Sequence, residues 1–385
     1  MGSRKYLVVG AGFSGAVIAR ELAENGLKVV CIDKRSHIAG NCHTERDVET
    51  NVMVHKYGPH IFNTNDKTIW DYVNNFGEFV PFKNKVIADT EKGVFSMPMN
   101  LLTINQFFGT KLTPNTVEDF LKTKQVKIKE PKNFEEQALC FLGKELYHNF
   151  FYGYTKKQWG CEPKELPASI LKRLPIRFNY DDNYYNSKYQ GIPRDGYTAI
   201  VQNILDHNNI EIRLNNSYDK KDNNKFEHVF YTGPIDYYLD YKFGRLGYRT
   251  VFFEEEVYSG DYQGNAVINY CNMDIKYTRI HEHKHFAPWE YHEKSLILKE
   301  GSKETLDGDE PYYPKRLSED LIILEKYKKE LNKIKENVSF VGRLATYRYL
   351  DMDKVIEEAL AYSRYFLKNN ESNNSIKRKL FSNEI

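Results

Sequence analysis

The sequence predicts an α/β fold to which a helical region and an antiparallel sheet are added, and three patterns support this. An apolar strand from Tyr6 runs into the turn Gly10-x-Gly12-x-x-Gly15, and a helical pattern follows it. Residues 100–175 have mostly helical apolar spacing. Between about 236 and 300 the apolar residues alternate in short runs, as they do in an antiparallel sheet.

The other elements follow in chain order. Residues 83–97 predict a hairpin that turns around Glu91-Lys-Gly93. A last helix begins near Asp351 or Asp353, and the polar, basic tail from Asn369 is expected to be disordered. Strands are predicted at 28–33, 210–214, 228–232 and 337–341, and a further helix at 197–205.

Length, charge and cysteine content narrow the possible functions. A chain of 385 residues predicts two or three domains. A net charge of only +2 offers no general attraction for nucleic acid, so an anion site must be a local cluster of Arg or Lys. The five scattered cysteines indicate reduced thiols. With no signal-peptide pattern and no apolar run long enough for a membrane span, we expect a cytoplasmic protein.

The glycine turn predicts a dinucleotide site. Gly10 permits the tight turn, Gly12 permits close backbone approach, and Gly15 permits helix–strand packing. Asp33 ends the second strand eighteen residues beyond Gly15, where a carboxylate accepts the ribose hydroxyls. The alternative is an ordinary strand-to-helix turn.

Three later segments favour FAD over NAD. Lys34 opens a short loop to Gly40-Asn41, as in the extended motif of FAD-dependent amine oxidases. Thr232-Gly233 resembles the late strand end of such domains, and Gly342 resembles their closing turn. Arg343 stands where many flavoproteins have Asp or Glu; together with the N-terminus of the last helix it would favour a reduced, anionic flavin. Alternatively, Arg343 forms a surface ion pair.

An aromatic helix and a proline-bracketed segment predict the substrate side. Phe151, Thr155 and Trp159 recur at helical spacing with Tyr154 beside them, as either a platform for a base or sugar or a core stripe. Residues 165–178 carry Lys172 and Arg173 between two prolines, as either a mobile lid that brings a cation to a phosphate or a solvated turn.

Two further arginines, Arg249 and Arg279, suit a diphosphate because their forks bind it bidentately. If residues 279–285 form a strand, Arg279, His281, His283 and His285 share one face. No carboxylate or cysteine completes a ligand set in this pattern, so we expect no metal.

Signature stretches over nearly the whole chain resemble those of bacterial UDP-galactopyranose mutases. They are Tyr57-Gly-Pro-His60-Ile-Phe62, Tyr154-Thr-Lys-Lys-Gln-Trp159, Arg173 with Phe178-Asn-Tyr-Asp-Asp-Asn-Tyr184, Tyr189-Gln-Gly-Ile-Pro193, Arg279 with Glu282-His-Lys-His-Phe286, and Gly342-Arg343 with Tyr347-Arg-Tyr349-Leu-Asp351. Asn63 replaces a frequent histidine, and Cys161 follows Trp159-Gly160; neither affects a group that the chemistry needs.

The resemblance implies a flavin-dependent isomerase that interconverts UDP-galactopyranose and UDP-galactofuranose without net redox change. In that family, N5 of reduced FAD acts as the nucleophile at the anomeric carbon. The resemblance also implies a UDP-sugar substrate, an external reductant such as NAD(P)H or a reductase, and a homodimer. Two alternatives stay open: an amine-oxidase-like FAD oxidoreductase, and a non-catalytic flavoprotein that binds nucleotide sugars.

The resemblance further implies three domains and a set of site residues. A Rossmann-like FAD-binding α/β domain would comprise 1–66, 191–235 and 336–368; a helical bundle 99–182, with its lid near 165–178; and an antiparallel-sheet domain 67–98, 183–190 and 236–335, before the tail 369–385. Catalytic roles fall to His60, Arg173, Arg279 and Arg343. Cofactor contacts are expected from Gly10, Gly12, Phe13, Ser14, Gly15, Asp33, Lys34, Gly40, Asn41, His60, Gly233, Gly342, Arg343, Tyr349, Asp351 and Met352. Substrate contacts are expected from Phe151, Tyr154, Thr155, Trp159, Arg173, Tyr184, Arg249, Arg279, Tyr313, Arg343 and Tyr349.

Overall fold

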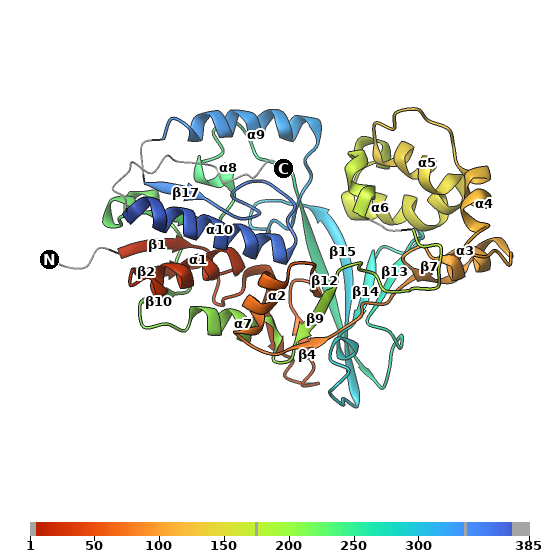
Figure 1. Ribbon diagram of the computed structural model, residues 1–385, viewed down its shortest axis with the longest axis horizontal. Coiled ribbons are helices and arrows are strands. Elements are labelled where there is room, and N and C mark those ends of the chain that lie inside the picture. Colours follow the sequence, from red (N-terminus) through yellow and green to blue (C-terminus); the bar gives the residue numbers. More distant parts are fainter. Residues whose placement is uncertain (1–4, 174–175, 335–336, 372–385) are drawn as a thin grey trace.

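A parallel sheet forms the centre of the part of the molecule on the left of Figure 1. The computed structural model describes residues 5–173, 176–334 and 337–371. The strand order is β10-β2-β1-β11-β17, and every pairing within it is parallel. The strands are β1 (Lys5–Val9), β2 (Lys28–Ile32), β10 (Ile210–Arg213), β11 (Val229–Tyr231) and β17 (Val338–Phe340). The order reverses on either side of β1, and ligands of open α/β sheets bind at such a reversal.

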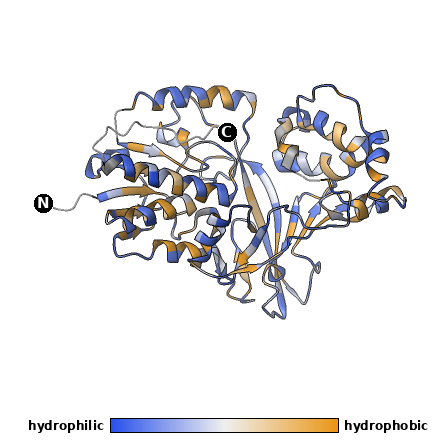
Figure 2. Cartoon of the chain, viewed as in Figure 1, coloured by the Kyte–Doolittle hydropathy of each residue, from blue (hydrophilic) through white to orange (hydrophobic). Residues whose placement is uncertain are grey.

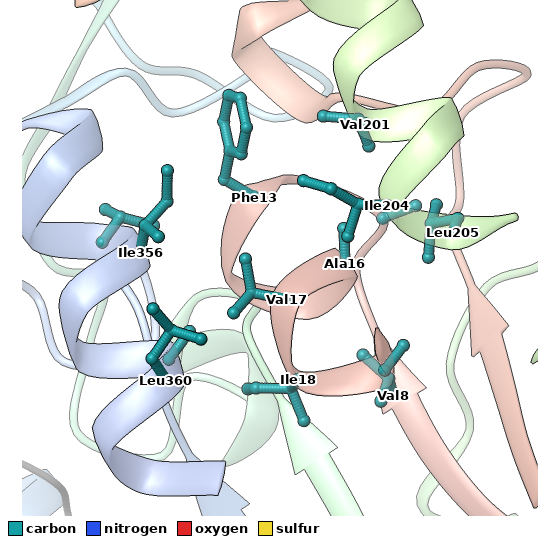
Figure 3. Packing of buried hydrophobic residues seen from close by; sticks show 14 of the residues in the cluster. Val8, Phe13, Ala16, Val17, Ile18, Val201, Ile204, Leu205, Ile356 and Leu360 are labelled. Atoms are coloured by element: carbon teal, nitrogen blue, oxygen red, sulfur yellow. The ribbon is translucent and has the colours of Figure 1, made fainter. Parts of the chain in front are cut away.

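Helices cover both faces of this sheet. On one face, α1 (Phe13–Glu24), α7 (Gly196–Leu205) and α10 (Met352–Glu371) share a buried core, whose side chains interlock in Figure 3. Figure 2 shows α10 as a mixture of orange and blue residues, as expected for a helix buried on one side only. On the other face, α8 (Ile235–Tyr238) and α9 (Ser318–Leu331) pack in a second core.

The second large sheet has the order β16-β12-β15-β14-β13-β7-β8 and is antiparallel except where β13 pairs with β7. Its strands are β7 (Val86–Thr90), β8 (Gly93–Met97), β12 (Tyr248–Ser259), β13 (Val267–Tyr270), β14 (Arg279–Glu282), β15 (Lys294–Glu304) and β16 (Tyr313–Pro314). Smaller sheets pair β3 (Thr44–Arg46) with β4 (Met53–His55), and β5 (Phe62–Thr64) and β6 (Phe79–Pro81) with β9 (Tyr189–Pro193).

A helical region lies beyond the second sheet, on the right of Figure 1. Its α-helices are α3 (Leu101–Phe108), α4 (Val117–Lys124), α5 (Phe134–Leu146) and α6 (Gly153–Trp159), with a π-helical segment at Tyr147–Tyr152 between the last two. Short 3₁₀ segments follow at Pro163–Glu165 and Ala168–Arg173. Among the described residues, no helix is both long enough and apolar enough to span a membrane.

The predicted fold class is confirmed, and so are the hairpin, the helix at 197–205 and the predicted strands, to within a residue or two at their ends. The expected extent of the sheet domain needs correction at both ends. Helix α2 (Lys67–Asn74) buries Ile69 and Val73 in the core of the parallel sheet. Segments 235–246 and 318–331 also pack against that sheet, as α8 and α9.

The tail needs one further correction. Helix α10 continues to Glu371, so the boundary expected at residue 369 is too early. Residues 372–385, the rest of that expectation, lie outside the described residues.

Candidate active site

The glycine turn has the geometry that a bound pyrophosphate requires. Gly10 has φ +103°, and a Cβ there would lie 2.1 Å from Thr232 Oγ1. A Cβ on Gly15 would lie 1.8 Å from the Gly10 carbonyl oxygen, so only glycine lets α1 pack this closely. Asp33 Oδ2 accepts a hydrogen bond from the Ala11 amide at 2.8 Å, which fixes the carboxylate beside the turn.

A cavity of about 650 Å³ runs from this turn toward the second sheet. Its volume lies in the range of ligand-binding clefts. Twelve of the expected cofactor residues line it: Gly10, Gly12, Phe13, Ser14, Asp33, Lys34, Gly40, Asn41, His60, Gly233, Arg343 and Met352. Gly15 and Gly342 support its wall instead, because a Cβ on Gly342 would lie 2.5 Å from Ser14 Oγ.

The cavity is also lined by residues that the sequence analysis missed. They lie in the loop 216–218, at Tyr237 and Tyr241, and in the loop 304–312. The second loop is held by ion pairs of Glu310 with Lys34 and Arg35, both at 2.7 Å, and by a pair of Asp307 with Arg245. Nothing in the spacing of these loops marks them, because they meet only through the fold.

Aromatic and cationic side chains from separate elements gather near His60, which also lines the cavity. The Arg343 guanidinium lies 5.4 Å from the centre of the Tyr349 ring and 5.9 Å from that of Tyr313. These two rings stack with their centres 5.7 Å apart. Burial raises the pKa of Tyr154, and the charge of Arg279 opposes that shift.

The same electrostatic coupling links Arg279 to Tyr184 and Tyr313. In Tyr313, burial raises the pKa to about 12 against the charges of Arg279 and Arg343. Burial raises the pKa of the neighbouring Tyr185, and the negative charge of Asp351 adds to this rise. The fold thus brings Tyr154, Tyr184, Arg279, Tyr313, Arg343 and Tyr349 to one region from five segments of the chain.

A fully buried carboxylate orients Arg279. Glu300 Oε1 accepts hydrogen bonds from Arg279 Nε at 3.0 Å and from Arg279 Nη2 at 2.7 Å. Its other oxygen lies 2.7 Å from His281 Nε2. Burial raises the pKa of Glu300, but Arg279 and His281 outweigh this effect and lower it to about 2. The guanidinium is therefore held rigidly, with a side-chain exposure of 26%.

His60 is neutral at ordinary pH. Burial and the charge of Arg343 lower its pKa to about 4, against a backbone hydrogen bond at Gly58. Its Nδ1 is buried and has no hydrogen-bond partner among the described residues. It can therefore offer a nitrogen lone pair or an N–H to a bound ligand, but it carries no charge with which to hold a phosphate.

Arg249 is engaged within the protein. Its Nε donates to the Gln158 carbonyl at 3.1 Å and to Ser302 Oγ at 3.0 Å, and Nη1 donates to Glu304 at 3.1 Å. Its side chain is 4% exposed. These contacts anchor the end of α6 to the second sheet.

The remaining expected substrate residues lie on or near α6. Phe151 is 5% exposed and packs in the core of the helical region, with Trp159 partly buried against the same cluster. Thr155 is also buried. The backbone of Arg173 ends the 3₁₀ segment Ala168–Arg173, but the side chains of Lys172 and Arg173 lie outside the described part of the structure, as do residues 174–175 of the expected lid.

Two premises about the histidine-rich segment are not met in the structure. Strand β14 ends at Glu282, and a 3₁₀ segment follows, so His283 and His285 do not continue the face of Arg279. Carboxylates do lie beside these histidines, since His285, Glu282 and Asp261 offer atoms within 4.8 Å of one another. The Lys284 ammonium already pairs with Asp261 at 2.5 Å, and backbone amides and Ser295 bind Glu282, so these charges are satisfied without a metal.

The parallel sheet, its glycine turn and the cavity define a protein with a Rossmann-like dinucleotide-binding domain. Residues 8–76 match the family model of the NAD(P)-binding Rossmann-like domain. A crystal structure of a reduced UDP-galactopyranose mutase aligns with a TM-score of 0.76 at 14% identity, covering 96% of this chain and 94% of that one. A putrescine oxidase aligns with a TM-score of 0.57 at 11% identity, covering 95% and 99%. At these identities the likeness establishes the fold alone.

Sequence comparison identifies the family. Residues 149–349 match the family model of UDP-galactopyranose mutase. A probable UDP-galactopyranose mutase of Klebsiella pneumoniae is 54% identical over 95% of this chain and 96% of its own. A dTDP-fucopyranose mutase of Escherichia coli is 50% identical over 95% and 99%. The chain belongs to the UDP-galactopyranose mutase family.

Proposed function

We propose that this chain interconverts UDP-galactopyranose and UDP-galactofuranose with reduced FAD and without net redox change. The observation that carries the proposal is the cluster of Arg279, Arg343, Tyr313 and Tyr349 beside the cavity, of which Arg343 lines the cavity itself. A diphosphate suits such a cluster, because guanidinium forks bind it bidentately and tyrosine hydroxyls donate to it.

The residues of the cavity fit FAD. Asp33 would accept the ribose hydroxyls, and the turn at Gly10 and Gly12 would approach the pyrophosphate. Arg343 and Met352, where α10 begins, line the cavity beside His60. When bound and reduced, FAD supplies a nucleophilic nitrogen for the anomeric carbon. The positive charge of Arg343 and the helix N-terminus favour the electron-rich form.

The chain's own side chains bind and orient the substrate. Arg279, fixed by Glu300, would hold the diphosphate as the sugar leaves and returns. Tyr154, Tyr184, Tyr313 and Tyr349 would add hydrogen-bond donors, with Thr155 and Trp159 at the uridine end. Arg173, in the expected lid 165–178, would add a further positive charge beside the diphosphate. Neutral His60 and Asp351 would lie beside the flavin and the sugar.

We further propose that an external reductant, NAD(P)H or a reductase, maintains the reduced flavin, and that the enzyme acts as a cytoplasmic homodimer.

A second candidate substrate has one specific observation in its favour. The dTDP-fucopyranose mutase that is 50% identical over 95% of this chain differs from the first relative in nucleotide base and sugar.

The test incubates purified protein with UDP-galactofuranose under dithionite and follows UDP-galactopyranose by chromatography. The proposal predicts conversion that depends on flavin reduction. A parallel incubation with dTDP-fucopyranose shows whether that substrate is turned over faster. Binding of UDP without turnover of either sugar would instead indicate a non-catalytic nucleotide-sugar protein. Consumption of oxygen or another acceptor in step with product would indicate an oxidoreductase.

A further inference from the structure

Lys157 on α6 is enclosed by backbone carbonyls. Its Nζ donates to the carbonyl oxygens of Tyr270 at 2.9 Å, Asn272 at 2.7 Å, Ile275 at 2.8 Å and Tyr277 at 2.8 Å. All of these acceptors are neutral. An ammonium has three N–H groups, so the carbonyls share its protons in a cage that suits a compact cation. Burial lowers the pKa of Lys157 to about 8, with Cys271 acting in the opposite direction, so it remains charged at neutral pH.

The carbonyls belong to the turn that joins β13 to β14, which we call the 270–277 turn. Gly153, one helical turn before Lys157, faces the same turn: a Cβ there would lie 2.1 Å from the Cys271 carbonyl oxygen. Helix α6 therefore lies directly against the 270–277 turn, and Lys157 links them. Without the ammonium, the carbonyls that converge on it would lose their shared donor.

Both partners of this link carry substrate-side residues. Arg279, at the start of β14, comes two residues after Tyr277. Helix α6 carries Tyr154, Thr155 and Trp159, and Tyr154 is already coupled electrostatically to Arg279. The position of the substrate-side residues of α6 relative to Arg279 therefore depends on the contact between α6 and the 270–277 turn.

We propose that Lys157 is a positioning residue that sets the spacing between the nucleotide-binding face of α6 and the diphosphate-binding Arg279. This inference rests on the proposed function and deepens it. It implies that the carbonyl cage, once emptied of the lysine, binds a small cation with N–H donors, and that this cation restores nucleotide binding.

The experiment measures UDP binding to the FAD-loaded enzyme by titration calorimetry in wild type, Lys157→Ala and the matched control Lys156→Ala. Lys156 is the adjacent residue of α6, but it pairs with Glu162 at the surface. Lys157→Ala is expected to raise the Kd for UDP about tenfold, because misplacing Arg279 relative to α6 weakens charge-assisted hydrogen bonds to the diphosphate. Lys156→Ala should leave the Kd unchanged.

The Lys157→Ala titration is repeated in ammonium chloride and in tetramethylammonium chloride at equal ionic strength. Ammonium should restore much of the lost affinity. Tetramethylammonium should not, because it has no N–H and does not fit the cage, although it screens charge equally. In turnover assays, KM should rise more than kcat falls.

Failures of the two proposals are distinguishable. If wild type does not bind UDP, the proposed function is wrong. If wild type binds UDP and Lys157→Ala binds it equally well, or if both salts act alike, the inference alone is overturned. Should Lys157→Ala not fold, Lys157→Met keeps the aliphatic stem and is expected to show the same weakened binding. Wild-type affinity in that variant, or failure of both variants to fold, would assign Lys157 a purely structural role.

Discussion

Glu300 shows how a single buried residue defines the chemistry of its neighbours. It is fully buried and carries a negative charge beside Arg279 and His281. A buried charge is costly unless it is paired, so its presence fixes the guanidinium in position. Arg279 is nevertheless 26% exposed, which leaves part of its fork free for a phosphate. The guanidinium of Arg279 is thus held rigidly by Glu300 and is still accessible to a phosphate.

Replacing Arg279 tests this assignment. Arg279→Ala should lower kcat/KM by a factor that corresponds to a loss of about 2–5 kcal/mol of transition-state binding, because a buried phosphate would lose its charged partner. The same change removes the guanidinium partner of the buried Glu300, leaving it with His281, and should also lower the melting temperature. Arg279→Lys keeps a charge beside Glu300 but loses the fork, so it should stay folded and still lose activity. Steady-state kinetics of the reduced enzyme decide the matter; unchanged kcat/KM in both variants would remove Arg279 from the site.

Single residues also mark a limit of sequence interpretation. Arg249 and Arg279 both appear in the sequence as arginines of predicted strands. The structure separates them by their partners, since Arg249 is occupied by Gln158, Ser302 and Glu304. Arg279 also binds a carboxylate, Glu300, but its side chain is 26% exposed against 4% for Arg249. Such partners come from distant segments, so local pattern cannot reveal which guanidinium stays accessible.

At the scale of elements, the first strand–turn–helix unit could be predicted in full because every signal in it is local. The glycine spacing, the apolar strand and Asp33 lie within one continuous segment. Helix α9 was not predicted, although it buries Leu324, Tyr327 and Leu331 against the parallel sheet. Its sequence is largely charged, so its weak apolar stripe does not identify the surface that it covers.

The loop 304–312 lines the cavity beside Lys34 and Arg35. It has no regular pattern that predicts this role, because its contacts to Lys34, Arg35 and Arg245 all join distant segments. Its position implies a part in retaining the cofactor.

Glu310→Gln should accelerate FAD release about two- to thirtyfold, because the change removes two partly exposed ion pairs that contribute roughly 0.2–1 kcal/mol each. The matched control is Glu330→Gln on α9, a carboxylate that likewise pairs with two cations, Lys242 and Lys333, but does not line the cavity. The rise of flavin fluorescence after dilution measures the release rate. Equal rates in wild type and Glu310→Gln would exclude a retaining role for the loop.

At the scale of the whole molecule, the candidate site exists only where separate parts meet. Arg279 comes from the second sheet, Tyr154 from the helical region and Arg343 from the end of the parallel sheet. The fold class could be predicted because each part has its own periodicity. The domain limits could not be predicted as well, since α2, α8 and α9 return to the first sheet from segments assigned elsewhere.

Buried histidines at this junction predict acid sensitivity. Burial lowers the pKa of His55 to about 3 and that of His60 to about 4, from 6.5. The unfolded chain takes up these protons below pH 6.5, whereas the folded protein does not. Stability should therefore fall as pH decreases from about 6.5 toward 4, by up to about 1.4 kcal/mol per pH unit for each histidine.

Glu300 extends this loss to lower pH. Its lowered pKa means that the unfolded state binds its proton near pH 4.5, and the folded state only near 2. Melting temperatures recorded at constant ionic strength from about pH 7.5 to about pH 4.5, roughly two pH units below the free histidine pKa, test the histidine prediction, and further points below about pH 4.5 test that for Glu300. A constant melting temperature over that interval would contradict it.

The most direct test of the central claim counts product against electrons. The FAD-loaded protein is reduced anaerobically with stoichiometric dithionite and given a large molar excess of UDP-galactofuranose, while flavin absorbance and both sugar nucleotides are followed. The account predicts many molecules of UDP-galactopyranose per flavin, with the flavin still reduced at the end. Product limited to the reducing equivalents supplied, or flavin reoxidised in step with product, would contradict it.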